Sequence, residues 1–143
     1  MVMELPAEEK IGLRQLAERF GIRLILQFGS TVSGQTHARS DLDLALQFSN
    51  SEVPFDTVLE VQAALSENFP DREVDLAILN RADPLFLRKI TEQCRLLYGT
   101  SQDLARLRLY AFKRYQDFRP YLNFERHFVS RRLAGLTAES PRS

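Results

Sequence analysis

The spacing of apolar residues predicts alternating helices and strands over the first hundred residues of the chain. From Pro6 onward, apolar side chains recur at helical spacing up to Gly21, and a glycine commonly ends a helix. The segments IRLILQF (22–28) and DLDLALQF (41–48) are short runs of strand-forming residues. We therefore expect an amphipathic helix followed by two strands.

The next part of the chain repeats this alternation. Residues 54–69 have the spacing of a helix, and the segment REVDLAIL (72–79) is typical of a third strand. Asp83 followed by Pro84 is typical of a helix start, and RLLYG (95–99) predicts a short edge strand. The pattern favours an α/β sandwich around a small sheet, whose strand order it leaves open.

The C-terminal part is predicted to be helical throughout, with one interruption. Thr100 precedes Asp103 by three residues, which resembles a capping box at the start of a long helix. Arg119 and Pro120 are expected to interrupt that helix, because the residue before a proline disfavours helical geometry. A second helical piece follows over 122–135, and the tail from about residue 135 is expected to be frayed.

Charge divides the chain in the same place. Residues 1 to 100 carry 10 basic and 15 acidic side chains, whereas residues 101 to 143 carry 9 basic and 4 acidic side chains. The net charges of −5 and +5 cancel over the whole chain. We therefore expect two parts with different tasks, a domain at 1–99 and a C-terminal helical extension at 100–143.

The composition excludes several classes of protein. At 143 residues with 44% hydrophobic and 27% charged residues, the chain has the composition of one ordinary soluble domain. No segment approaches the ~18 consecutive apolar residues that span a bilayer, and the acidic start lacks the positive region of a secretory signal. The single cysteine, Cys94, excludes an internal disulfide and a cysteine-based zinc site. We therefore expect a cytoplasmic protein.

Three acidic residues on two predicted strands form the candidate site. Alternation places Asp41 and Asp43 on one face of a strand, and a small sheet would bring Asp75 on the next strand near them. An isolated Asp-x-Asp is more often a solvated strand face, but converging carboxylates without matching arginines need a cation. Their hard oxygen ligands suit Mg²⁺, and two such ions would clamp the oxygens of a phosphoryl-type transfer.

Gly29 and Ser30 complete the candidate site. They follow the first predicted strand, where a turn offers backbone N–H groups and a hydroxyl to a phosphate. The glycine permits a close approach of the ligand. Either pattern alone recurs by chance, but the Gly-Ser and the Asp-x-Asp together, in strand context, are far more specific.

The Gly-Ser and Asp-x-Asp patterns together resemble the motif of a known family. The stretch GSTVSGQTHARSDLDL (29–44) is similar to the Gly-Ser, ten residues, Asp-x-Asp signature of the polymerase-beta-like nucleotidyltransferase superfamily, and the chain length resembles its minimal (MNT) branch. The resemblance covers about residues 10–100 and includes Gly34, Ser40 and the strand EVDLAIL (73–79). It implies the small mixed sheet of the nucleotidyltransferase fold, flanked by helices.

The resemblance assigns roles to individual residues. Asp41 and Asp43 would bind Mg²⁺ together with the triphosphate of ATP, and Asp75 would help to bind the catalytic metal. Gly29 and Ser30 would hold the β- and γ-phosphates.

The resemblance also implies a reaction. Many minimal members are similar to antitoxins encoded beside a helical HEPN ribonuclease, which they silence by transferring AMP from ATP to a tyrosine. We therefore expect an adenylyltransferase whose metal, held by Asp41 and Asp75, lowers the pKa of the tyrosine hydroxyl. Many members carry a basic residue soon after the serine, where this chain has Thr31, and Arg39 is expected to compensate.

The C-terminal segment combines arginines with aromatic residues. Leu104, Leu107, Ala111, Tyr115 and Phe118 recur at helical spacing, which predicts that part of this stripe packs against the sheet domain. The aromatic residues of the segment are too widely spread for a single buried face, so some are expected to be exposed to a partner. We rank a protein partner above RNA, which the interleaved arginines would also suit.

Two further functions stay open on the sequence. A chain with a degenerate nucleotide pocket would act as a binding-only antitoxin that occludes its partner. Alternatively, the chain would transfer a nucleotide to RNA or to the hydroxyl of a small molecule. The sequence specifies neither the acceptor nor whether the chain forms homo- or hetero-oligomers.

Overall fold

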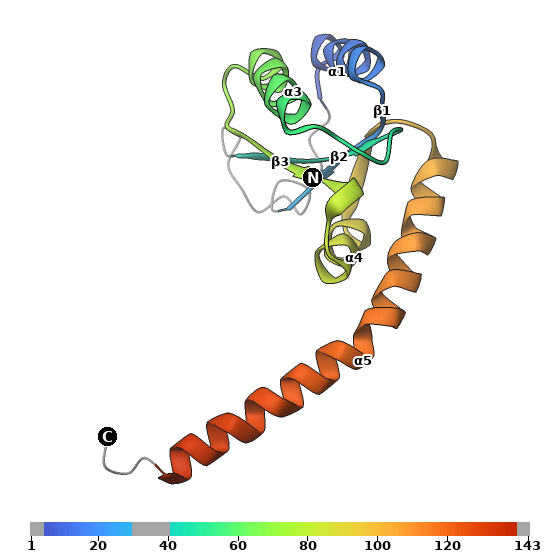
Figure 1. Cartoon of the computed structure of the whole chain (residues 1–143). Helices are drawn as coiled ribbons and strands as arrows, with labels where there is room; N and C mark the ends of the chain where they lie inside the picture. Colours follow the sequence, from blue (N-terminus) through green and yellow to red (C-terminus); the bar gives the residue numbers. More distant parts are fainter. Residues whose placement is uncertain (1–4, 30–40, 140–143) are drawn as a thin grey trace.

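The structure is a computed structural model that describes residues 5–29 and 41–139, with side chains described for 5–29 and 41–120. The described residues form a four-stranded sheet with strand order β3-β2-β1-β4 (Figure 1). β1 is antiparallel to both of its neighbours, whereas β2 and β3 are parallel, so the sheet is mixed as expected. The strands are β1 (Ile22–Phe28), β2 (Leu42–Phe48), β3 (Val74–Ile78) and β4 (Cys94–Tyr98).

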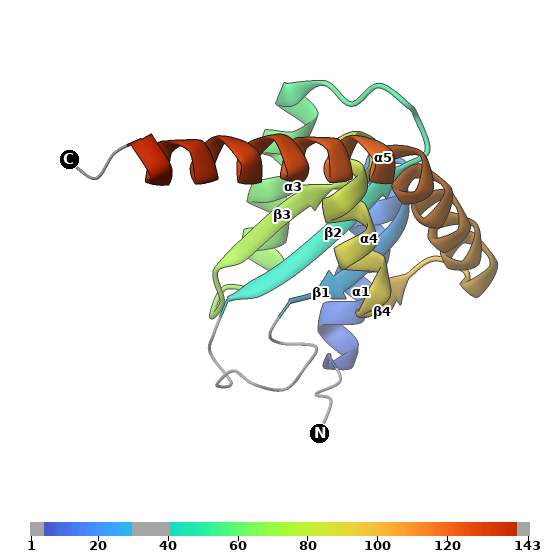
Figure 2. The same ribbon diagram turned by 90° about the horizontal axis from the view of Figure 1, so that it is seen from below.

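Helices cover both faces of this sheet (Figures 1 and 2). On one face lie α1 (Ala7–Phe20) and α3 (Phe55–Asn68), whose buried residues join the leucines of β2 in one hydrophobic cluster. On the other face lie α4 (Pro84–Glu92) and the start of α5 (Ser101–Glu139), which share a second cluster with β1. The α/β sandwich predicted from the sequence is confirmed.

Most predicted element ends are confirmed by their local geometry. α1 ends at Gly21, which has a left-handed φ of 67°. α4 begins after Asp83, whose Oδ1 accepts a hydrogen bond from the Phe86 N–H at 2.9 Å, with Pro84 at the first helical position. The third strand is shorter than predicted, because Leu79 begins a 3₁₀ turn (Leu79–Arg81) that leads into α4.

The prediction of two C-terminal helical pieces is wrong. α5 is one helix that contains Pro120 and extends to Glu139, past the point at which the chain was expected to fray. A proline inside a helix removes one backbone hydrogen bond and kinks the helix, but it need not end it. Figure 1 shows α5 bent partway along, with its far half pointing away from the sheet domain.

The first turns of α5 are held firmly against α4. Leu104, Leu107 and Ala111 are buried as predicted, whereas Tyr115 and Phe118 of the same stripe are half-buried. Arg108 donates from Nε to the Thr91 carbonyl at 3.2 Å, which joins α5 to the end of α4. No helix in the part of the chain that the structure describes is both long and apolar enough to cross a membrane.

Two leucines of α3 test where the hydrophobic core lies. Leu65 is fully buried, whereas Leu59 is 53% exposed on the same helix. We predict that Leu65→Ala lowers the free energy of unfolding by about 2–5 kcal/mol, because it removes buried methyl groups and leaves a cavity. Leu59→Ala should cost less than about 1 kcal/mol. Urea unfolding of both variants would check this, and equal losses would contradict the placement of the core.

Candidate active site

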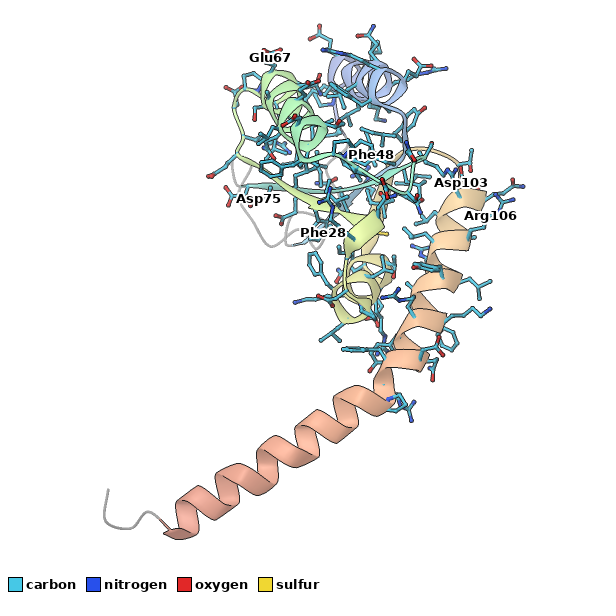
Figure 3. All side chains as sticks on the ribbon, in the orientation of Figure 1. Phe28, Phe48, Glu67, Asp75, Asp103 and Arg106 are labelled. Atoms are coloured by element: carbon cyan, nitrogen blue, oxygen red, sulfur yellow. The ribbon has the colours of Figure 1, made fainter. Side chains whose placement is uncertain are left out.

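The two strands β2 and β3 bring two carboxylates side by side. They run parallel with Asp43 and Asp75 as register partners, each the second residue of its strand. Leu42 and Leu44 are buried in the cluster beneath α1 and α3, so Asp43 between them points to the α4 face. Figure 3 shows Asp75 at the start of β3. The predicted meeting of these two carboxylates is confirmed.

Asp41 lies just before β2 and is exposed, but it still acts on Asp43. The pKa of the Asp43 carboxyl is raised, first by its partial burial and then by the nearby charges of Asp75 and Asp41. A hydrogen bond between the Asp43 and Asp75 side chains raises it further. Two ion pairs of the described residues, Arg88–Glu92 and Arg106–Asp103, lie on α4 and α5, away from these carboxylates.

Gly29 meets this acidic pair at the end of β1. Its φ of 83° lies in the left-handed region, and a β-carbon at this position would collide with the Asp43 carboxylate. Gly29 therefore lies directly against the Asp43 side chain, whereas the approach of a phosphate to Gly29 stays a prediction. Ser30 and Arg39, the other two residues assigned to the nucleotide, lie outside the described residues.

A pocket of about 470 Å³ opens beside the carboxylates, between the sheet and α4. Sequence reasoning did not assign a site role to most of its lining. Phe28 and Phe86 meet there edge to face, with ring centroids 6.0 Å apart. Arg81 and Asp83 also line the pocket, and the Nη2 of Arg81 donates to the Val53 carbonyl at 2.7 Å. The position of Phe28 next to Gly29 could have indicated that Phe28 belongs to the site. Asp83 was predicted only as a helix cap.

The carboxylates of this site fit Mg²⁺ better than they fit a metal ion whose ligands all come from the protein. Among the residues that the structure describes, no group of three His, Cys, Asp or Glu side chains could hold a metal ion by itself. Asp43 and Asp75 are nevertheless adjacent, with Asp41 close enough to affect Asp43. Mg²⁺ is usually bound by one or two carboxylates together with waters and substrate phosphates. These residues thus fit an ion that a phosphate-bearing ligand would help to hold.

The raised pKa of Asp43 predicts how its removal affects folding. A carboxyl whose pKa is raised in the folded state stabilises that state below its unfolded pKa and loses this contribution as the pH rises through the folded pKa. Without metal, Asp43→Asn should therefore increase the free energy of unfolding at about pH 7, and the gain should shrink towards about pH 4. Urea unfolding in the presence of EDTA would measure this gain. Glu60→Gln, which alters an exposed carboxylate of α3, is the control. A gain in the free energy of unfolding that does not change with pH would contradict the repulsion between the carboxylates.

Comparison with known proteins agrees with this geometry. Residues 12–103 match the family model described as "Polymerase beta, Nucleotidyltransferase". No curated protein matches the chain. Among solved structures, a toxin-antitoxin complex with AMP-PNP has a TM-score of 0.69 at 24% identity and covers 87% of this chain and 98% of its own.

A second similar structure is the complex of a tri-AMPylated Shewanella oneidensis HEPN toxin with its MNT antitoxin. It has a TM-score of 0.65 at 22% identity and covers 88% of this chain and 96% of its own. The toxin-antitoxin pair MntA–HepT is similar at a TM-score of 0.64 and 22% identity, over 88% of this chain and 97% of its own. These structures share the fold, and the family model spans most of the present chain. The chain belongs to the polymerase beta nucleotidyltransferase family.

Proposed function

We propose that the chain is a Mg²⁺-dependent adenylyltransferase that transfers AMP from ATP to a tyrosine hydroxyl of a HEPN-type toxin and thereby acts as its antitoxin. The observation that carries the proposal is the in-register pair Asp43 and Asp75 beside an open pocket, within a nucleotidyltransferase domain. Two of the similar structures support the reaction, since one was solved with AMP-PNP and another contains a tri-AMPylated HEPN toxin.

Asp41, Asp43 and Asp75 would hold the magnesium ions. Bound Mg²⁺ would supply Lewis-acid stabilisation of the charge that develops on the phosphate oxygens and would lower the pKa of the attacking hydroxyl. The adjacent carboxylates repel one another, which raises the pKa of Asp43 and makes a cation the natural partner of the pair. This repulsion would favour the state of the site in which magnesium is bound.

In the transfer, the tyrosine oxygen forms a bond to the α-phosphorus of ATP as the bond to the β-phosphate oxygen breaks. Pyrophosphate leaves, and the hydroxyl proton is released to solvent on the side where Asp75 is exposed. Gly29 keeps the chain close to Asp43. We assign Ser30 to the leaving phosphates, with Arg39 as their cationic partner. These phosphate-binding roles of Gly29, Ser30 and Arg39 are part of the proposal.

We assign partner docking to the C-terminal extension, residues 100–143, with the catalytic domain at 1–99. The family match ends near this boundary, at residue 103. Exposed apolar side chains mark α5, where Leu109 is 61%, Tyr110 50% and Phe112 59% exposed. Apolar and aromatic side chains of this kind are typical of protein interfaces. Because the reaction consumes ATP, we place the protein in the cytoplasm.

Transfer to the toxin tests the proposed function directly. The purified chain, incubated with labelled ATP, Mg²⁺ and the HEPN protein encoded beside it, should label a tyrosine of that protein. Asp43→Asn and Asp75→Asn should each lower the labelling rate by at least about 100-fold, because each removes a negative charge that would hold the magnesium ions. Glu60→Gln, which alters an exposed carboxylate on α3, should label like the unmodified chain.

Two results would contradict this assignment. Equal labelling by the Asp43→Asn and Asp75→Asn variants would remove the catalytic roles of the two carboxylates. Neutralisation of the toxin without ATP, and unchanged in both variants, would favour a binding-only antitoxin.

Gly29 gives a second test with a matched control. Gly29→Ala and Gly21→Ala both place alanine at a left-handed φ, which costs roughly 1–2 kcal/mol in each case. A β-carbon at Gly21 meets no other atom within 4 Å, whereas one at Gly29 collides with the Asp43 carboxylate. We therefore predict that only Gly29→Ala slows AMP transfer, by about 10-fold or more. Similar rates for both variants at matched stability would contradict the contact between Gly29 and Asp43.

A further inference from the structure

Short side chains leave room for a ligand beneath α4. On the strand face that carries Asp43 and Asp75, the next residues are Ala45 and Ala77. Ala45 is fully buried, and Ala77 lines the pocket together with the two carboxylates. The pocket thus extends from Asp43 and Asp75 along β3 to the start of α4. It is longer than a site for metal ions at the two carboxylates would need to be.

The α4 side of the pocket is aromatic. The Phe86 ring packs edge to face against Phe28, at an interplanar angle of 82°, and remains 38% exposed. An aromatic ring held by a second ring keeps a fixed orientation, and its free surface favours contact with a planar, apolar group. A flat aromatic part of a reactant would cover this surface.

Two polar side chains, Arg81 and Asp83, line this part of the pocket, and the Nη2 of Arg81 donates to the Val53 carbonyl. Asp83 lines the pocket, and its Oδ1 is used to cap α4 by accepting the Phe86 N–H. Its second carboxylate oxygen, Oδ2, makes no hydrogen bond to the residues that the structure describes. A carboxylate oxygen only accepts hydrogen bonds while it is ionised, so it selects a ligand that carries a donor, such as an amino group.

We infer that this part of the pocket is the subsite for the adenine ring, with Phe86 and Phe28 as the apolar surface and Asp83 as the acceptor for the exocyclic amino group. The inference rests on the proposed function, since it places the base of the nucleotide whose phosphates lie at Asp43 and Asp75. It makes Asp83 the residue that distinguishes adenine from a base with a carbonyl in place of the amino group.

The alternative occupant of the pocket is the ring of the acceptor tyrosine. A tyrosine has one polar group, its hydroxyl, which must be directed at the phosphorus beside Asp43 and Asp75. It would leave Asp83 without a donor. Adenine carries its amino group on the side of the ring away from the ribose, so phosphates at the carboxylates and an amino group at Asp83 are compatible.

Binding of ATP and of inorganic tripolyphosphate to the full-length chain, both with Mg²⁺, tests the aromatic surface. Phe86→Ala should weaken ATP binding by about 5- to 150-fold, the range expected for one base–aromatic stack. It should leave tripolyphosphate binding unchanged, and Phe86→Tyr should restore ATP binding. Phe55→Ala removes an exposed phenylalanine from α3, on the opposite face of the sheet, and should change neither affinity.

The outcomes separate this inference from the proposed function. If the unmodified chain binds neither ATP nor tripolyphosphate, the nucleotide site itself is refuted and the base subsite with it. If both ligands bind, two results refute the base subsite alone. Phe86→Ala either leaves the affinity for ATP unchanged, or weakens the binding of ATP and of tripolyphosphate equally. A higher KM for the toxin at an unchanged ATP affinity would assign the pocket to the acceptor instead.

Asp83→Asn tests the selection of the base. Asparagine is as good a helix cap as aspartate, so α4 is preserved, while the free carboxylate oxygen is exchanged for an N–H₂ donor. Inosine triphosphate carries a carbonyl where ATP carries the amino group. We expect the ratio of ATP to inosine triphosphate affinity to fall by at least about 10-fold in this variant. An unchanged ratio would overturn the role of Asp83.

Discussion

The repulsion between neighbouring carboxylates is the constraint on which the site depends. Asp43 and Asp75 are register partners on two parallel strands, so their side chains leave the sheet on the same side and at the same level. Burial and the charges of Asp75 and Asp41 raise the pKa of Asp43, because the ionised carboxylate is unfavourable there in the absence of a cation. The fold can hold such a pair because the opposite face of β2, with Leu42 and Leu44, is buried in a complete hydrophobic cluster.

The same alternation shapes the space around the pair. On the acidic face each aspartate is followed by an alanine, and the short side chain of Ala77 lines the pocket that remains between β3 and the start of α4. The wall of that pocket is fixed at several points. Asp83 caps α4, Phe86 of its first turn packs on Phe28, and Arg81 is held by the Val53 carbonyl. A pocket with fixed walls needs little reorganisation when a ligand binds.

Helix α4 also connects this pocket to the C-terminal extension. Leu87 and Ile90 are buried in the cluster that contains the first turns of α5. The Arg88 guanidinium lies 3.9 Å from the centre of the Tyr115 ring, so the contact continues along the helix pair. The exposed residues of α5 are therefore presented on a base that is packed against one wall of the site. A protein bound to this helix would lie at a defined position relative to the carboxylates.

The sequence by itself determined the order of the elements, the helix caps at Asp83 and Gly21, and the opposite faces of Asp43 and its neighbours Leu42 and Leu44, because these follow from local propensity and from the two-residue repeat of a strand. The tertiary structure decided what depends on contacts between distant segments. Only the parallel pairing of β2 with β3 makes Asp75 the partner of Asp43. Only the packing of α4 on the sheet turns Phe86 into a wall of the pocket. The continuation of α5 through Pro120 also escaped prediction, since local preference at a proline does not decide between a bend and an end.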